Sequence, residues 1–188
     1  FSKTTAMFGD EGPFNQRLRE ILCTYAVFRA DLGYVQGMSF LAAAMLLHLR
    51  SNAEAFICLA NLIVSHHFFA FFSLQQDVLE KYWNIFEKLL RSRLPAVAEL
   101  LESECIPLPA FLYPWFQSCF LSVLPLNDGC RLFDCFLLDG TPVLFSTALA
   151  VLELLEPALI SSADTGSLLS RTKAWAERIW QERVTGKQ

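Results

Sequence analysis

Residues 28–47 read FRADLGYVQGMSFLAAAMLL, which places a glycine-flanked glutamine directly before a long apolar run. Gly33 and Gly37 bracket the turn, and glycine takes a positive φ without steric cost. Residues 38–49 are apolar on nearly all sides, so they predict a buried helix. Gln36 can either cap a helix–helix turn or act on something outside the core. Taken alone, these residues favour the structural turn.

Helical periodicity runs through almost the whole chain. Apolar residues recur every three or four positions over residues 14–28, and again over residues 78–90. Ser51 or Asn52 can cap a further helix that continues to about Val64. No stretch alternates with the period of two that a half-buried strand requires. The sequence therefore predicts an all-α fold of about eight or nine helices.

Prolines divide the second half of the chain into short helices. They are Pro95, Pro107, Pro109, Pro114, Pro125, Pro142 and Pro157. An Asn-Asp-Gly run at 127–129 and an Asp-Gly pair at 139–140 mark further boundaries. We expect two helical lobes whose boundary lies near 95–109, and a last, more charged helix over residues 164–184.

Composition excludes several classes of protein. Hydrophobic residues make up 54 % and charged residues 18 % of the 188 residues, which favours a folded globule over disorder. The net charge of −4 gives no basic surplus for nucleic acid. The longest apolar run, residues 40–47, is far shorter than the ~20 residues of a transmembrane helix. The chain begins at Phe1 without a leader, and we expect it to be part of a longer protein.

The cysteines predict reduced thiols. They are Cys23, Cys58, Cys105, Cys119, Cys130 and Cys135. None forms a C-x-x-C pair, and several lie within apolar helical patterns, so we expect buried, unpaired side chains. Such thiols are typical of a reducing compartment.

No pattern for metal or nucleotide chemistry stands out. His66 and His67 are adjacent, so on a helix their side chains diverge by about 100° and are poorly placed to share an ion. His48 is isolated, and no phosphate-binding loop or nucleophile elbow occurs. We therefore expect no metal, no cofactor of the chain's own and no intrinsic hydrolase site.

Gln36 offers a different chemistry. Its carboxamide carries a donor and an acceptor on one rigid plane, a geometry suited to aligning a water for in-line attack on a phosphoryl group. Held on a glycine turn and backed by a rigid helix, it could be inserted into the nucleotide site of another protein.

Two stretches carry a family resemblance. LREILCTYAVFRADLGYVQGM resembles the pattern L-x-x-I-L-x-A-Y-A-x-x-x-P-x-x-G-Y-x-Q-G-M of the TBC domain, the helical domain of Rab GTPase-activating proteins. YPWFQSCFLSVLPLNDGCRLFDCFLLDG resembles the family's W-F-x-x-x-F-x-x-x-L-P…R-x-W-D-x-x-x-x-x-G segment. The resemblance covers residues 12–155. It implies a TBC domain over residues 1–188 that is incomplete at its N-terminus.

The resemblance implies a role for each motif residue. It makes Gln36 the glutamine finger, which acts in trans on GTP bound to a Rab, with Gly33, Tyr34, Gly37 and Met38 as its supporting neighbours. The protein would then be an enzyme regulator. GTP and Mg²⁺ would belong to the Rab, recognised in its GTP-bound form. We expect a role in vesicle trafficking and a location in the cytoplasm, peripheral to endomembranes through the Rab.

Some positions depart from the family pattern. Arg131 and Asp134 match the R-x-W-D element, with Phe133 in place of tryptophan, and their i, i+3 spacing predicts a structural ion pair. Ala30 replaces a frequent proline and Phe40 a frequent aspartate, which could alter the loop or the choice of partner.

The family's second catalytic group is an arginine in I-x-x-D-x-x-R, and the printed sequence contains no such motif. On the usual spacing it would lie just upstream of Phe1. Two alternatives stay open: a Rab-binding scaffold of the same fold without catalysis, and a helical lipid carrier. The carrier would use the aromatic residues Phe68, Phe69, Phe71, Phe72 and Trp83.

Overall fold

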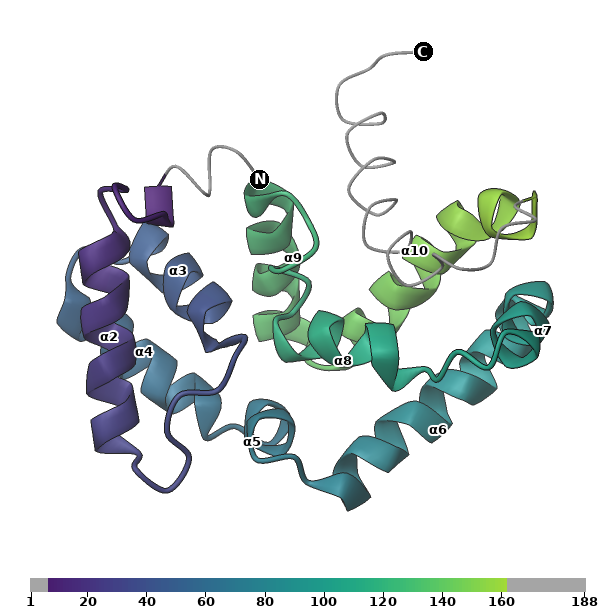
Figure 1. The fold of residues 1–188 in the computed structure, drawn as a ribbon, viewed down its shortest axis with the longest axis horizontal. Coiled ribbons are helices and arrows are strands. Elements are labelled where there is room, and N and C mark those ends of the chain that lie inside the picture. Colours follow the sequence, from purple (N-terminus) through teal and green to yellow (C-terminus); the bar gives the residue numbers. More distant parts are fainter. Residues whose placement is uncertain (1–6, 162–188) are drawn as a thin grey trace, which may run out of the picture. The chain divides into compact units, whose positions relative to one another are not determined.

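The structure is a computed structural model that describes residues 7–161, and every regular element in that part of the chain is a helix (Figure 1). The helices are α2 (Asn15–Phe28), α3 (Met38–His48), α4 (Asn52–Ile63), α5 (His66–Phe72), α6 (Gln76–Arg93), α7 (Pro95–Ser103), α8 (Pro109–Gln117), α9 (Leu126–Asp139) and α10 (Pro142–Ser161). The predicted all-α class is confirmed over these residues. The helix expected over residues 164–184 lies outside them.

The chain divides into two compact units, residues 1–75 and 76–188. The boundary expected near 95–109 does not coincide with this division. Pro95 and Pro109 instead begin α7 and α8, both within the second unit. Proline has no N–H, and the first turn of a helix needs none, so a proline there marks where a helix starts.

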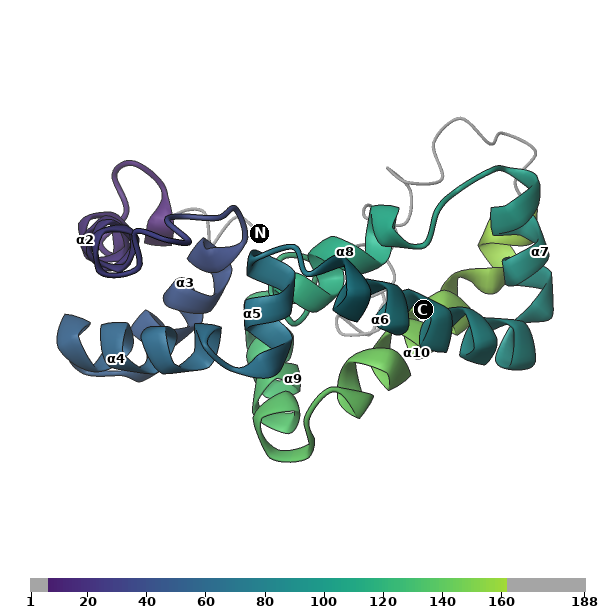
Figure 2. The same cartoon turned by 90° about the horizontal axis from the view of Figure 1, so that it is seen from below.

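Helices α2, α3 and α4 contact one another in the first unit, and α5 contacts α4 (Figure 2). Helix α4 begins with a capping box: Glu54 N–H donates to Ser51 Oγ at 3.2 Å, and Ser51 N–H donates to Glu54 Oε2 at 3.0 Å. Ser51 is thus one of the two caps that the sequence allowed. Among the described helices none alone is long and apolar enough to cross a bilayer, and only α4 with α5, bent by 84°, meets that test as a pair.

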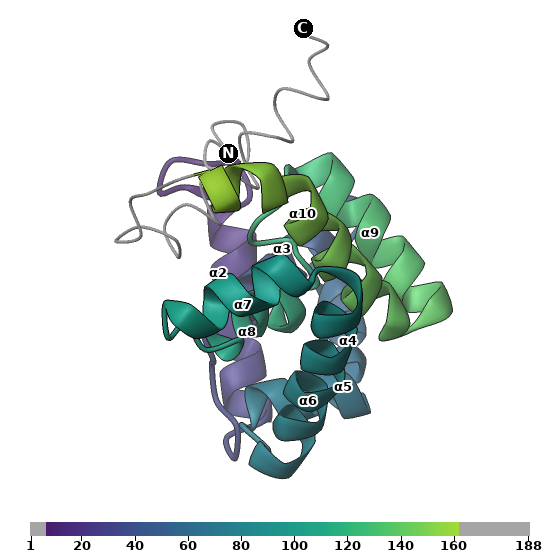
Figure 3. The same ribbon diagram turned by 90° about the vertical axis from the view of Figure 1, so that its right-hand side faces the viewer.

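Helix α10 contacts α6, α7, α8 and α9, so it holds the second unit together (Figure 3). The core of this unit is aromatic. The Phe116 ring centroid lies 5.2 Å from that of Phe145, 6.4 Å from that of Phe86 and 6.3 Å from that of Phe120. Such tilted and edge-to-face contacts add to the stabilisation that burial alone supplies.

Both predicted boundaries in this part of the second unit lie at the ends of α9, which begins at Leu126. Helix α9 ends at Asp139 and Gly140 follows with a φ of 77°, as the Asp-Gly pair indicated. The Asn-Asp-Gly run at 127–129 lies inside the first turn of α9. A Cβ on Gly129 would come within 3.2 Å of Leu121 Cδ2, so the glycine there permits close packing and does not end a helix.

The cysteines are all unpaired, as expected, but only Cys119 and Cys130 are buried. The other four are exposed, so the prediction of burial is wrong for them. Apolar neighbours in sequence do not decide which face of a helix a residue occupies. Cys23 follows Leu22, and Cys58 lies between Ile57 and Leu59, yet both cysteines lie on the exposed faces of α2 and α4.

Helix α7 ends in a left-handed turn. Ile106 N–H donates to Leu101 O at 2.8 Å and Cys105 N–H donates to Glu102 O at 3.0 Å, the two bonds of a Schellman motif. Cys105 takes a φ of 52° at the position where glycine is usual.

We predict that Cys105→Gly raises the free energy of unfolding by about 1 kcal/mol, because it removes the cost of a side chain in the left-handed region. Urea denaturation of the 188-residue chain measures the change. Cys135→Gly is the matched control: it removes an exposed cysteine inside α9 and should lower the free energy of unfolding by about 0.3 kcal/mol, the difference in helix propensity between the two residues. A loss of stability in Cys105→Gly would contradict the prediction.

Candidate functional site

The loop from α2 to α3 begins with a tight reversal. Arg29 N–H donates to Tyr25 O at 2.8 Å and caps α2. Leu32 and Gly33 N–H then both donate to Arg29 O, at 3.0 and 2.7 Å. Gly33 takes a φ of +67°, and a Cβ placed on it would meet nothing within 4 Å. The glycine is therefore required by the backbone conformation and not by lack of space.

An ion pair secures this reversal. Arg29 Nε donates to Asp31 Oδ1 at 2.8 Å and Arg29 Nη2 donates to Oδ2 at 2.7 Å. These bonds raise the pKa of Arg29 and lower that of Asp31. The Arg29 guanidinium carbon also lies 5.9 Å from the Phe69 ring centroid, which links the loop to α5. Asp31 is exposed, so we assign this pair a role in holding geometry and little net stability.

The second half of the loop is anchored by Met38. Met38 N–H donates to Val35 O at 3.2 Å, and Val35 N–H donates to Met38 Sδ at 3.4 Å. Met38 is completely buried, at 0 % exposure. Gly37 is the N-cap of α3 with a φ of 105° and a ψ of −28°. Gln36 thus stands inside a turn that both a buried side chain and a left-handed glycine define.

Helix α3 gives this turn a rigid support. Leu41 and the three consecutive alanines 42–44 are buried. Small side chains let α2 and α4, which both contact α3, approach it closely. A closely packed helix of this kind resists displacement, so the residue just before its N-terminus has a defined position.

The carboxamide of Gln36 faces solvent. Gln36 is exposed, and within the described part of the chain its side chain makes no hydrogen bond. Helix α3 has no side-chain cap, so Gln36 does not cap it. Tyr34 and Phe40 flank it with exposures of 51 % and 38 %. The site presents an unbonded amide on a fixed turn, with two exposed aromatic residues nearby in the sequence.

Arg131 and Asp134 lie on α9, and both are exposed. The ion pair predicted from their spacing is not formed: within the described residues neither makes a salt bridge. Favourable spacing on a helix brings two side chains within reach, but exposed side chains gain little by pairing. The carboxylate of Asp134 instead acts on a neighbour, since burial first and Asp134 second raise the pKa of Cys130.

The histidine pair begins α5, with Ser65 as its N-cap residue. His66 is exposed, whereas His67 is buried with its ring 4.7 Å from that of Phe71 and 4.9 Å from that of Phe68. The two side chains thus occupy different environments. No group of three or more ligating side chains is placed to hold a metal ion in the part of the chain that is described.

The sequence identified the motif residues of the loop but not all the contacts that hold the loop in place. The Arg29–Asp31 pair and its contact with Phe69 were not predicted. The signal was present as an arginine and an aspartate two positions apart, with the aspartate two residues before the loop glycine. Met38 was expected to support the loop, but nothing in the sequence indicated that its sulfur accepts a hydrogen bond from Val35.

Comparison with known proteins shows what class of domain this arrangement defines. A family model described as RabGAP-TBC, the Rab-GTPase-TBC domain, matches residues 1–160. The solved TBC domain of a Chlamydomonas flagellar RabGAP superposes with a TM-score of 0.79 at 25 % identity, covering 97 % of this chain and 63 % of that one.

Relatives in animals are similar in sequence over most of the chain. TBC1 domain family member 12 of Xenopus tropicalis is 37 % identical over 154 residues, and TBC1 domain family member 14 of Homo sapiens is 36 % identical over 153 residues. These alignments cover 82 % and 81 % of this chain but 22 % of each relative, so the chain spans about a fifth of their length. The chain belongs to the Rab-GTPase-TBC domain family.

We predict that Gly37→Val distorts the turn, because a β-branched residue is strained at a φ of 105°. The free energy of unfolding should fall by about 1–3 kcal/mol. Gly33→Asn is the matched control, since asparagine tolerates the left-handed conformation and the space around Gly33 is open. Urea denaturation compares the two variants. Equal stability of Gly37→Val and the unsubstituted chain would show that the turn does not require glycine.

Proposed function

We propose that the domain activates GTP hydrolysis by a Rab-family small GTPase, with Gln36 as a glutamine finger that acts in trans. The observation that carries this proposal is the unbonded, exposed carboxamide of Gln36 on a turn fixed by Gly37 and Met38. Membership of the Rab-GTPase-TBC family supports the choice of a Rab as partner.

The chemistry follows from the two faces of the amide. The carbonyl oxygen accepts a hydrogen bond from the attacking water, while the NH₂ group donates to an acceptor beside it. Phosphoryl transfer depends mainly on positioning and charge stabilisation. A carboxamide whose backbone is already fixed loses little conformational entropy when it aligns that water. The domain is then a regulator, and the bond that breaks belongs to the partner's nucleotide.

The mechanism needs a nucleotide, a metal ion and an arginine beside the glutamine. GTP and its Mg²⁺ are held by the Rab, so the domain contributes no cofactor of its own. Neutralising the charge that develops on the phosphates requires an arginine, which we place in an I-x-x-D-x-x-R motif outside the printed sequence. Rabs act at endomembranes, so we propose a cytoplasmic site of action reached through the Rab, in vesicle trafficking.

We predict that Gln36→Ala in the full-length protein abolishes stimulated GTP hydrolysis, a fall of about a hundredfold or more. Single-turnover hydrolysis across a panel of GTP-loaded Rabs measures it. Gln76→Ala, at the exposed start of α6, is the matched control and should keep the rate. Thermal unfolding of both variants should match the unsubstituted protein. An unchanged rate in Gln36→Ala would rule out the catalytic role of Gln36, whereas binding without any stimulation by the unsubstituted protein would identify a Rab-binding scaffold.

We further predict that the 188-residue chain binds a GTP-loaded Rab but stimulates it weakly. An arginine finger contributes about 10³–10⁵ in rate, and none of the chain's arginines stands in the required motif. Binding is measured by calorimetry and stimulation by single-turnover hydrolysis, against the full-length protein as the reference. Stimulation by the chain that equals the full-length protein would show that no further arginine is needed.

A further inference from the structure

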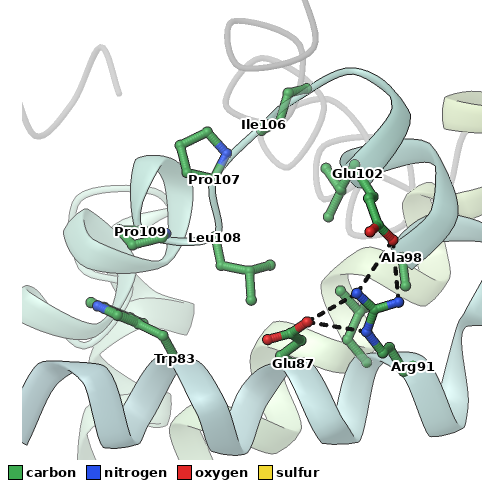
Figure 4. A pocket seen from close by; sticks show the side chains of 11 residues that line it. Trp83, Glu87, Arg91, Ala98, Glu102, Ile106, Pro107, Leu108 and Pro109 are labelled. Carbon is green, nitrogen blue, oxygen red and sulfur yellow. Dashed lines mark hydrogen bonds and ion pairs between the residues drawn. The ribbon is translucent and has the colours of Figure 1, made fainter.

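The second unit contains a cleft of about 360 Å³ that the proposed function does not use (Figure 4). It lies between α6, α7 and the residues that lead from α7 into α8. Its walls are mostly apolar: Leu108 points into the space, with Pro107 above it and Trp83 at one end (Figure 4). An apolar cleft with a few polar groups is the usual form of a binding site.

The polar groups of the cleft gather at its other end. Arg91 Nη2 contacts Glu87 Oε1 at 3.0 Å, and Arg91 Nη1 contacts Glu102 Oε2 at 3.3 Å (Figure 4). The remaining hydrogen bonds of Arg91 go to the same two oxygens. These bonds, that to Glu87 first, raise the pKa of Arg91.

One oxygen of each carboxylate is left over. Within the described residues, Glu87 Oε2 and Glu102 Oε1 have no hydrogen-bond partner. Two carboxylates face a single guanidinium, so this end of the cleft carries a surplus negative charge. It offers acceptors that a cation can use, and it repels an acidic or phosphorylated ligand.

The cleft is also preformed. Arg91 pairs with Glu87 on its own helix, and it joins α6 to α7 through Glu102. The Schellman bonds fix the chain at Ile106, and Pro107 and Pro109 restrict the backbone beyond it. A site that is already ordered loses less conformational entropy when a ligand binds.

We propose that this cleft binds a short peptide segment of a partner protein in which an arginine or lysine stands beside apolar side chains. The apolar side chains fill the space around Leu108, and the cation bonds to the free oxygens of Glu87 and Glu102. Charge complementarity selects this occupant: the cleft combines apolar walls with acidic acceptors at one end. The cleft lies wholly in the second unit, so the proposal does not depend on the role of Gln36.

The experiment uses a phage library of random twelve-residue peptides with the 188-residue chain as bait. Selected peptides should be enriched in arginine or lysine next to leucine, isoleucine or phenylalanine. Their binding should be lost in Leu108→Arg, which places a cation in the cleft. Enrichment of acidic peptides, of peptides that bind Leu108→Arg equally, or of no peptide would overturn the proposal.

Charge variants separate recognition from a bracing role. The double variant Glu87→Gln with Glu102→Gln should weaken the selected peptides about tenfold in fluorescence anisotropy, because it removes charge-assisted acceptors. Arg91→Gln removes the same ion pairs but leaves both carboxylates, so it should preserve or strengthen binding. Glu153→Gln, on α10, is the control and should leave affinity unchanged. If the double variant and Arg91→Gln weakened peptide binding equally, the three charged residues would only hold α6 against α7. That result would overturn the proposal.

Discussion

The left-handed turn at Gly37, closed by buried Met38, is the constraint on which the site depends. Only a glycine adopts the φ of 105° found there at low energetic cost. Met38 is the first residue of α3 and is buried. Its sulfur accepts a hydrogen bond from Val35 N–H, which closes the turn. Gln36 is left exposed as a consequence. Its position is set by its neighbours and owes nothing to its own side chain.

Each of the two units holds an unbonded polar group in a fixed position, but different elements do so. In the first, the Arg29–Asp31 pair and a buried helix hold a loop whose tip is a free polar group. In the second, the end of α7 and the glutamates around Arg91 hold a cleft whose acceptors are partly unused. In both, rigid backbone surrounds a group that has no partner within the described residues. That pattern is typical of a surface prepared for another molecule.

Patterns formed by residues close together in the sequence predicted the helices well. Contacts between residues far apart in the sequence were not predicted. The capping box of α4 is formed by Ser51 and Glu54, three residues apart in the sequence. The C-terminal end of α4 was predicted to within one residue. The Asn-Asp-Gly run marked the start of α9 to within one residue, but nothing in the sequence indicated that Gly129 lies in the helix and packs closely against Leu121. The Gln36 motif was found from a resemblance, while the pairing of Arg29 with Phe69 depends on how α5 lies and could not be read from the chain.

The most direct test of the central claim is a structure of the full-length protein bound to a Rab that holds GDP, Mg²⁺ and an aluminium fluoride analogue of the transferred phosphate. We predict that the Gln36 carboxamide lies within about 3 Å of the in-line water, the distance of a hydrogen bond. A structure in which the Rab's own glutamine holds that water, with Gln36 outside hydrogen-bonding distance, would contradict the account.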